Sequence, residues 1–131
     1  MTLNEMVNNF IANINEEYVA IESDTFEVNF NDYEINYAVE NEADDFYNNF
    51  VERFPLASNF APFTLSLLHE VGHLETEDEI IDDTEERNAI TNTADYFNLW
   101  NEAIATDWAG FFIEDNYELV EEFNNAVVEN L

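Results

Sequence analysis

Hydrophobic residues recur at steps of three and four through the first twenty positions, which is the spacing of one face of an α-helix. The spacing then changes to two, and aromatic or aliphatic residues alternate with polar ones, as in a β-strand with one buried face. We therefore expect an amphipathic helix over about residues 2–20. A β-hairpin should follow over residues 26–37, with Asn31 and Asp32 at its turn.

Helical spacing returns in the middle of the chain. A helix is expected over residues 43–54, beginning with Ala43 and ending before Pro55. Another is expected over residues 62–74, because Pro62 is well suited to the first turn of a helix.

Two further helices are predicted, over residues 94–113 and 117–131. Eight acidic residues lie between Glu75 and Glu86, and we expect a solvated loop there because dense like charges resist compaction. The sequence thus predicts one domain, residues 1–131, with a mostly helical α+β fold in which a small hairpin or sheet packs on the helices.

The charge of the chain restricts its partners. Against 31 Asp and Glu residues there are only 2 basic side chains, Arg53 and Arg87, which gives a net charge of −29. Such a surface repels nucleic acid and anionic membranes, so it either attracts a basic protein or suits a salty environment. The absence of cysteine excludes disulfides and thiolate metal ligands. The N-terminus lacks a basic segment followed by an apolar one, so we expect a cytoplasmic protein.

The two histidines of the chain lie four residues apart and enclose a glutamate, in the order His69-Glu70-Val71-Gly72-His73. This is the H-E-x-x-H signature of zinc hydrolases. On a helix His69 and His73 share a face and can offer two ring nitrogens to one cation, while Glu70 lies beside them as a base. The alternative is a pair of surface histidines that bind nothing.

A catalytic zinc site takes three protein ligands, so a third must come from outside this helix. Glu102 is the best candidate, because its neighbours on the same helical face are apolar or small and a buried, unpaired carboxylate there would be costly. The small Ala105 and Ala109 should also let the two helices approach closely. Alternatively, Glu102 lies at the rim and points to solvent.

The segment that begins at Glu102 reads E-A-I-A-T-D-W-A-G-F-F. Together with the H-E-x-x-H helix it resembles the gluzincin-type metallopeptidases of the ImmA/IrrE class, whose second helix typically reads E-x-x-A-N/D-x-F-A-x-x-L-L. Thr106 stands where that class has Asn or Asp, Asp107 follows one position later, and Trp108 stands for the aromatic residue. The residues that match are Glu102, Ala105 and Ala109, and Phe111 and Phe112 supply an apolar pair one position before the one that ends the pattern.

This resemblance covers roughly residues 60–115. It implies a zincin-like domain in which His69, His73 and Glu102 bind zinc and Glu70 is the general base. It also implies regulatory proteolysis, often of a DNA-binding repressor in phages or mobile elements.

Two functions from different classes are compatible with these features. The first is zinc-dependent hydrolysis of a basic DNA-binding regulator, with Tyr96 or Tyr117 as the donor that stabilises the oxyanion. The second is a non-enzymatic DNA mimic that inhibits a nucleic-acid-binding protein such as a nuclease or restriction enzyme. The charge serves both functions equally, whereas only the first accounts for the histidine motif.

Overall fold

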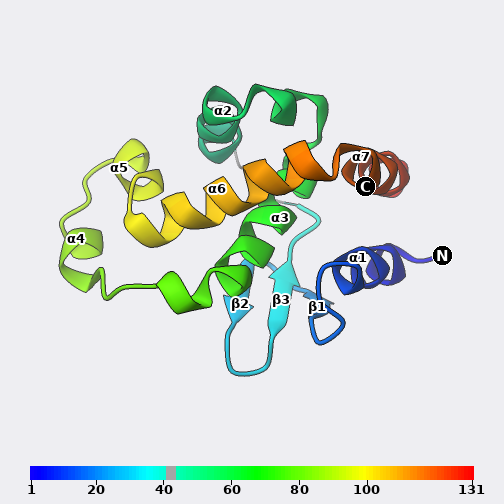
Figure 1. The fold of residues 1–131 in the computed structure, drawn as a ribbon, viewed down its shortest axis with the longest axis horizontal. Coiled ribbons are helices and arrows are strands. Elements are labelled where there is room, and N and C mark those ends of the chain that lie inside the picture. The colour runs from blue at the N-terminus through cyan, green and yellow to red at the C-terminus, as the bar shows by residue number, and fades with distance from the viewer. Residues whose placement is uncertain (41–43) are drawn as a thin grey trace.

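The computed structural model of the protein describes residues 1–40 and 44–131. Within these ranges the chain forms seven α-helices, two short 3₁₀-helices and a three-stranded sheet (Figure 1), which confirms a mostly helical α+β fold. In chain order the elements are α1 (Leu3–Ala12), β1 (Val19–Glu22), β2 (Glu27–Asn29), β3 (Glu34–Tyr37), α2 (Asp44–Arg53), η1 (Pro55–Asn59), α3 (Pro62–Glu75), η2 (Glu77–Glu79), α4 (Thr84–Asn88), α5 (Thr93–Phe97), α6 (Trp100–Asp115) and α7 (Tyr117–Val128).

The sheet has the strand order β1-β3-β2. Its β2 and β3 strands form the predicted hairpin, paired antiparallel with Val28 opposite Ile35. The turn between them contains Tyr33 in the left-handed region, at φ 51°. Ile35 and Tyr37 of β3 are fully buried, so the central strand anchors the sheet in the core.

The expected helix over residues 2–20 is wrong in its second half, because α1 ends at Ala12 and residues 19–22 form strand β1. This strand pairs parallel with β3. Its other edge is covered by α1, where the Asn8 amide accepts a hydrogen bond from the Ala20 N–H and donates one to the Ala20 carbonyl. These contacts, distant in sequence, satisfy the backbone groups of β1 better than continuation of the helix would.

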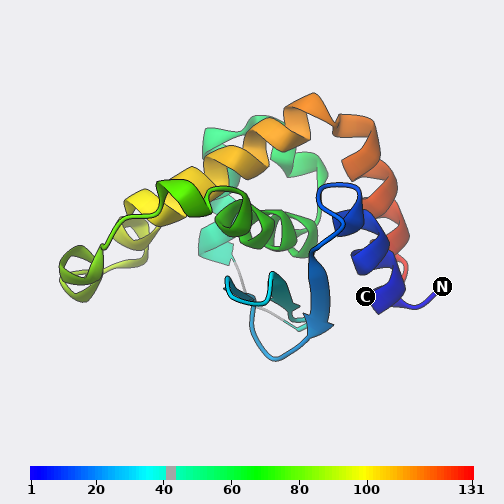
Figure 2. The same cartoon turned by 60° about the horizontal axis from the view of Figure 1, so that its bottom comes forward.

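Helix α3 lies at the centre of the fold, with the sheet on one side and α6 on the other (Figure 2). It begins with Pro62 in its first turn, as predicted. Leu65, Leu67, Leu68 and Val71 are fully buried. Because those residues surround the helix axis, α3 is enclosed by protein on several sides.

The helix predicted over residues 43–54 is present as α2, which runs from Asp44 to Arg53. Its predicted first residue, Ala43, lies outside the described residues. Chain direction changes after α2 at Pro55, which opens η1.

The single helix predicted over residues 94–113 is wrong, because the chain forms two helices, α5 and α6. The break falls at Leu99, whose backbone is extended (φ −56°, ψ 140°). Phe97 and Leu99 are both buried, and the break allows two closely spaced apolar residues to enter the interior. Phe97 packs against Phe46 of α2, with ring centroids 5.8 Å apart.

The acidic segment differs from the expected loop, since it contains η2 and α4. Its acidic side chains are exposed except for Asp83, which pairs with Arg87. Helix α7 follows as predicted and packs on α1, where Phe10 and Phe123 stack with centroids 4.0 Å apart. None of the described helices is long and apolar enough to cross a membrane.

Candidate metal centre

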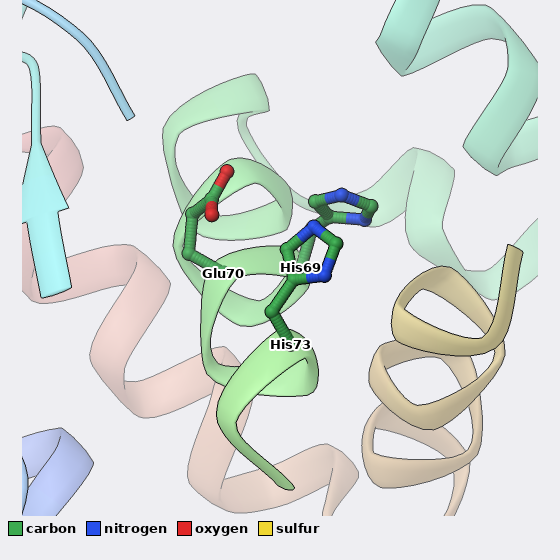
Figure 3. Close-up of side chains that lie close together, drawn as sticks. All are labelled: His69, Glu70 and His73. Atoms are coloured by element: carbon green, nitrogen blue, oxygen red, sulfur yellow. The ribbon is translucent and has the colours of Figure 1, made fainter. Parts of the chain in front are cut away.

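The H-E-x-x-H residues project from the middle of α3 (Figure 3). The two imidazole rings lie close together, with centroids 4.7 Å apart, and the Glu70 carboxylate extends on the adjacent side of the helix. One potential ligand atom from each of His69, Glu70 and His73 lies within 4.8 Å of the others. The helical spacing has therefore placed the three groups around one region, as i, i+1 and i+4 positions should.

Glu102 reaches the same region from α6. Its Oε1 atom is 3.2 Å from Nε2 of His69 and 3.2 Å from Nε2 of His73. The residue is only 5% exposed, so it does not lie at a solvent-facing rim. The structure thus brings together the three residues that the sequence suggested as ligands.

Close approach of α3 and α6 makes this arrangement possible. Gly72 of α3 faces the backbone of Ala105, and Ala105 and Ala109 are both fully buried between the helices. With small residues on both sides, the helix axes come near enough for a short glutamate side chain to reach the histidines.

Thr106, one turn after Glu102 on α6, contacts the ring nitrogen of His69 that faces away from Glu102. Its hydroxyl oxygen is 3.0 Å from Nδ1 of His69. An Nδ1–H that donates to this hydroxyl would leave Nε2 of His69 unprotonated, as a metal ligand must be. Without a cation, a proton on Nε2 instead forms the hydrogen bond to Glu102. Asp107 does not take this role, because it forms an ion pair with Arg53.

Arg87 of α4 is a member of the site that sequence reasoning missed. Its guanidinium donates to Oε2 of Glu102 at 3.1 Å and to Asp83 at 2.8 Å. It also lies over the ring of Tyr96, 5.4 Å from the centroid. The only local signal was its rarity, as one of two basic side chains in the chain. By engaging Oε2, Arg87 leaves Oε1 of Glu102 directed at the histidines.

The two tyrosines considered as oxyanion donors lie in different places. The Tyr96 hydroxyl donates to Oε1 of Glu102 at 3.2 Å, so Tyr96 is part of the site. Tyr117, the first residue of α7, instead accepts a hydrogen bond from Asn59, and it takes no part in the cluster.

Burial and hydrogen bonding shift the pKa values of these groups in opposite directions. Burial alone would raise the pKa of Glu102, but hydrogen bonds from His69 and His73 outweigh it and hold the pKa well below its usual range. Burial would lower the pKa of His73, yet its hydrogen bond to Glu102 reverses this and raises it. Burial also raises the pKa of Glu70. The cluster therefore favours an anionic Glu102 facing a positive charge.

The donor set and its spacing fit a zinc ion. Zinc in proteins is bound tetrahedrally by His and carboxylate ligands at about 2.0–2.2 Å, and ligand atoms in such a tetrahedron are about 3.3 Å apart. The Nε2 to Oε1 separations of 3.2 Å match this edge. Protons on the two histidines satisfy Glu102 in this structure. A cation that replaced these protons would meet two ring nitrogens and a carboxylate oxygen.

The cluster is open to a cleft on the side of Glu70. A cavity of about 610 Å³ adjoins His69, and a smaller one of about 280 Å³ adjoins His73. Phe26, Glu70, Tyr96 and Glu102 line both cavities, so the two are parts of one cleft that passes the histidines. Substrate-sized molecules can therefore reach the side chains of the motif.

Comparisons of this chain with protein-family models, curated proteins and solved structures gave no match.

Proposed function

We propose that this protein is a zinc-dependent metallopeptidase. The observation that carries the proposal is that Oε1 of Glu102 lies 3.2 Å from Nε2 of both His69 and His73, which is the spacing of ligand atoms around zinc. Zinc held there would polarise a scissile carbonyl and make a bound water more acidic. The resemblance of residues 60–115 to the ImmA/IrrE class of peptidases supports the same ligand set.

Glu70 is the general base of the proposed reaction. Its carboxylate lines the cleft beside the histidines and makes no hydrogen bond or ion pair with the residues that the structure describes. A carboxylate without a partner is free to take a proton from water and pass it to the leaving amine. Its raised pKa brings it nearer to the pH at which it must both accept and release a proton.

Tyr96 is the donor nearest to the reacting groups. Its hydroxyl already lies 3.2 Å from a carboxylate oxygen of the ligand Glu102. We propose that this hydroxyl turns to the carbonyl oxygen of the substrate as negative charge develops there.

An extended peptide can approach along strand β2. Among the described strands β2 pairs with β3 only, so its second edge has no strand partner. Phe26, Glu27, Val28 and Phe30 line the same cavity as Glu70 and His73. A peptide that added to this edge would be held in an extended form past the histidines, which suits cleavage of a flexible segment.

The proposed substrate is a basic DNA-binding regulator, as found in phages and mobile elements, which would place the activity in the cytoplasm. The net charge of −29 would steer such a protein toward the cleft and repel nucleic acid itself.

Glu70→Gln tests the proposal. The change keeps the size of the side chain but removes its ability to take up a proton, so zinc content and melting temperature should stay unchanged while hydrolysis falls by about 10²–10⁴-fold. The measurement compares zinc-loaded wild-type and variant protein for cleavage of an unfolded basic protein, such as a histone preparation. Equal cleavage by both proteins, or wild-type protein that takes up no zinc, would refute the proposal.

A DNA mimic remains the second candidate, because most of the acidic side chains between residues 75 and 86 are exposed and not neutralised by Arg87. Under this function Glu70→Gln would have no effect. Replacing Glu77, Asp78 and Glu79 by their amides would instead abolish inhibition of a DNA-binding protein, measured as release of DNA from that protein.

A further inference from the structure

The larger of the two cavities combines aromatic walls with negative charge. Its volume is about 610 Å³ and it lies between the start of α2, the middle of α3 and helix α5. The aromatic lining consists of Phe26, Phe46, Tyr96 and Phe97. The carboxylate lining consists of Asp44, Asp45, Glu70 and Glu102.

No lysine or arginine is found among the described residues that line this cavity. Arg87 approaches Glu102 from the side of the smaller cavity, and among the carboxylates that line the larger cavity it pairs with Glu102 alone. Glu70 is partly buried, faces the cavity and has no partner in the described chain. Asp44 and Asp45 are exposed at the start of α2, so their charge is solvated. The cavity therefore combines one partly buried carboxylate without a partner, Glu70, with two exposed carboxylates, an arrangement that favours entry of a cation.

The aromatic side chains that line the cavity pack against one another. Phe46 lies edge-on to His69 at 5.1 Å, and its ring centroid is 5.8 Å from that of Phe97. Tyr96 packs against Phe97 at 5.4 Å. Rings fixed in this way offer apolar surface to a chain of methylene groups and ring faces to a cation.

We propose that this cavity binds the side chain of a lysine or arginine in the substrate, adjacent to the bond that is cleaved. This inference rests on the proposed peptidase function and names the residue that the peptidase selects. The long aliphatic part of the side chain packs between the rings, and its charged end reaches Asp44 and Asp45 at the start of α2. An acidic side chain is repelled, and a purely apolar one leaves the carboxylates without a counterion.

The experiment measures binding of two blocked pentapeptides to zinc-loaded full-length protein. One peptide has arginine at its centre and the other has citrulline, which has nearly the same shape but no charge. The test variant is Asp44→Asn with Asp45→Asn. The matched control is Glu121→Gln with Glu122→Gln, which removes the same charge from exposed positions on α7. Zinc content is measured for every protein.

We expect the arginine peptide to bind wild type and control with affinities within about twofold of each other, and the cavity variant about tenfold more weakly. The citrulline peptide should bind all three proteins weakly. Equal weakening in variant and control would show that only the overall charge attracts the peptide, and equal binding of the two peptides would show that the cavity does not select charge. Either result overturns the proposal.

The outcome also separates this inference from the peptidase function. Selective binding of the arginine peptide without any hydrolysis would support the proposed role of the cavity and refute the proposed peptidase activity. Hydrolysis without any preference for basic residues would refute the proposed role of the cavity and support the proposed peptidase activity.

Discussion

Gly72 and Ala105 are in direct backbone contact across the helix pair that holds the candidate metal centre. A methyl group at position 72 would clash with the backbone carbonyl oxygen of Ala105. Glycine is required here for space, and its φ is ordinary for a helix. The motif H-E-x-x-H has two positions at which any residue is allowed. In this protein the second of them, Gly72, is restricted to glycine by packing against α6.

Gly72→Ala should destabilise the protein by about 1–3 kcal/mol, because the added methyl group must push α3 away from α6. The direction of the change in unfolding free energy is informative, because Gly→Ala within a helix normally stabilises a protein by about 0.5–1 kcal/mol. Urea unfolding followed by circular dichroism provides the measurement. A variant that is more stable than wild type would contradict the close approach of the two helices.

Thr106→Val should weaken zinc binding by about 10–100-fold, because the hydroxyl that orients the His69 ring is lost while the shape is kept. Thr106→Ser retains the hydroxyl and serves as the control. Competition with a chromogenic chelator gives the affinities. If valine and serine variants bind zinc equally well, Thr106 has no role in holding the ligand.

Zinc should stabilise the native protein, since a site formed across two core helices does not exist in the unfolded chain. At a free zinc concentration of 100 times the dissociation constant, the stabilisation should be about 2.7 kcal/mol. His69→Ala should abolish the rise in melting temperature, and Glu70→Gln should preserve it because Glu70 is not a proposed ligand. A rise of equal size in all three proteins would indicate zinc bound elsewhere on the acidic surface.

Salt should raise the melting temperature steadily. The acidic side chains that give the net charge of −29 repel one another in the folded state, which lowers its stability. Salt screens this repulsion, because the screening length falls from about 30 Å at 0.01 M to about 3 Å at 1 M. Sodium and potassium chloride should act alike if screening is the cause. A melting temperature that is unchanged or falls between these concentrations would show that self-repulsion does not limit stability.

The central features of the site were predictable because they depend on local spacing. His69 and His73 lie about one helical turn apart, and the apolar or small neighbours of Glu102 on its own helical face indicate that its carboxylate is buried. The role of these residues as metal ligands stays a prediction. Arg87 could not be placed in the same way, because its contact with Glu102 depends on the path of the whole segment between α3 and α6.

The errors in the fold have a common physical origin. Strand β1 continues the helical spacing of α1, and only its pairing with β3 and its contacts with Asn8 select the extended form. The break at Leu99 likewise arises from burial of neighbouring apolar side chains in the interior. Both depend on partners distant in sequence, which local periodicity does not contain.

The placement of Glu102 and Thr106 on successive turns of one helix makes the site sensitive to the axial register of α3 and α6. For a neighbouring residue to take the place of Glu102, α6 would have to move by about 1.5 Å along its axis and turn by about 100°. Asn101 or Ala103 would then face the histidines, and the ligand and its supporting hydroxyl would be lost together. Metal binding at these residues would therefore require one particular alignment of the two helices, so a change in their packing would be detected as a loss of metal affinity.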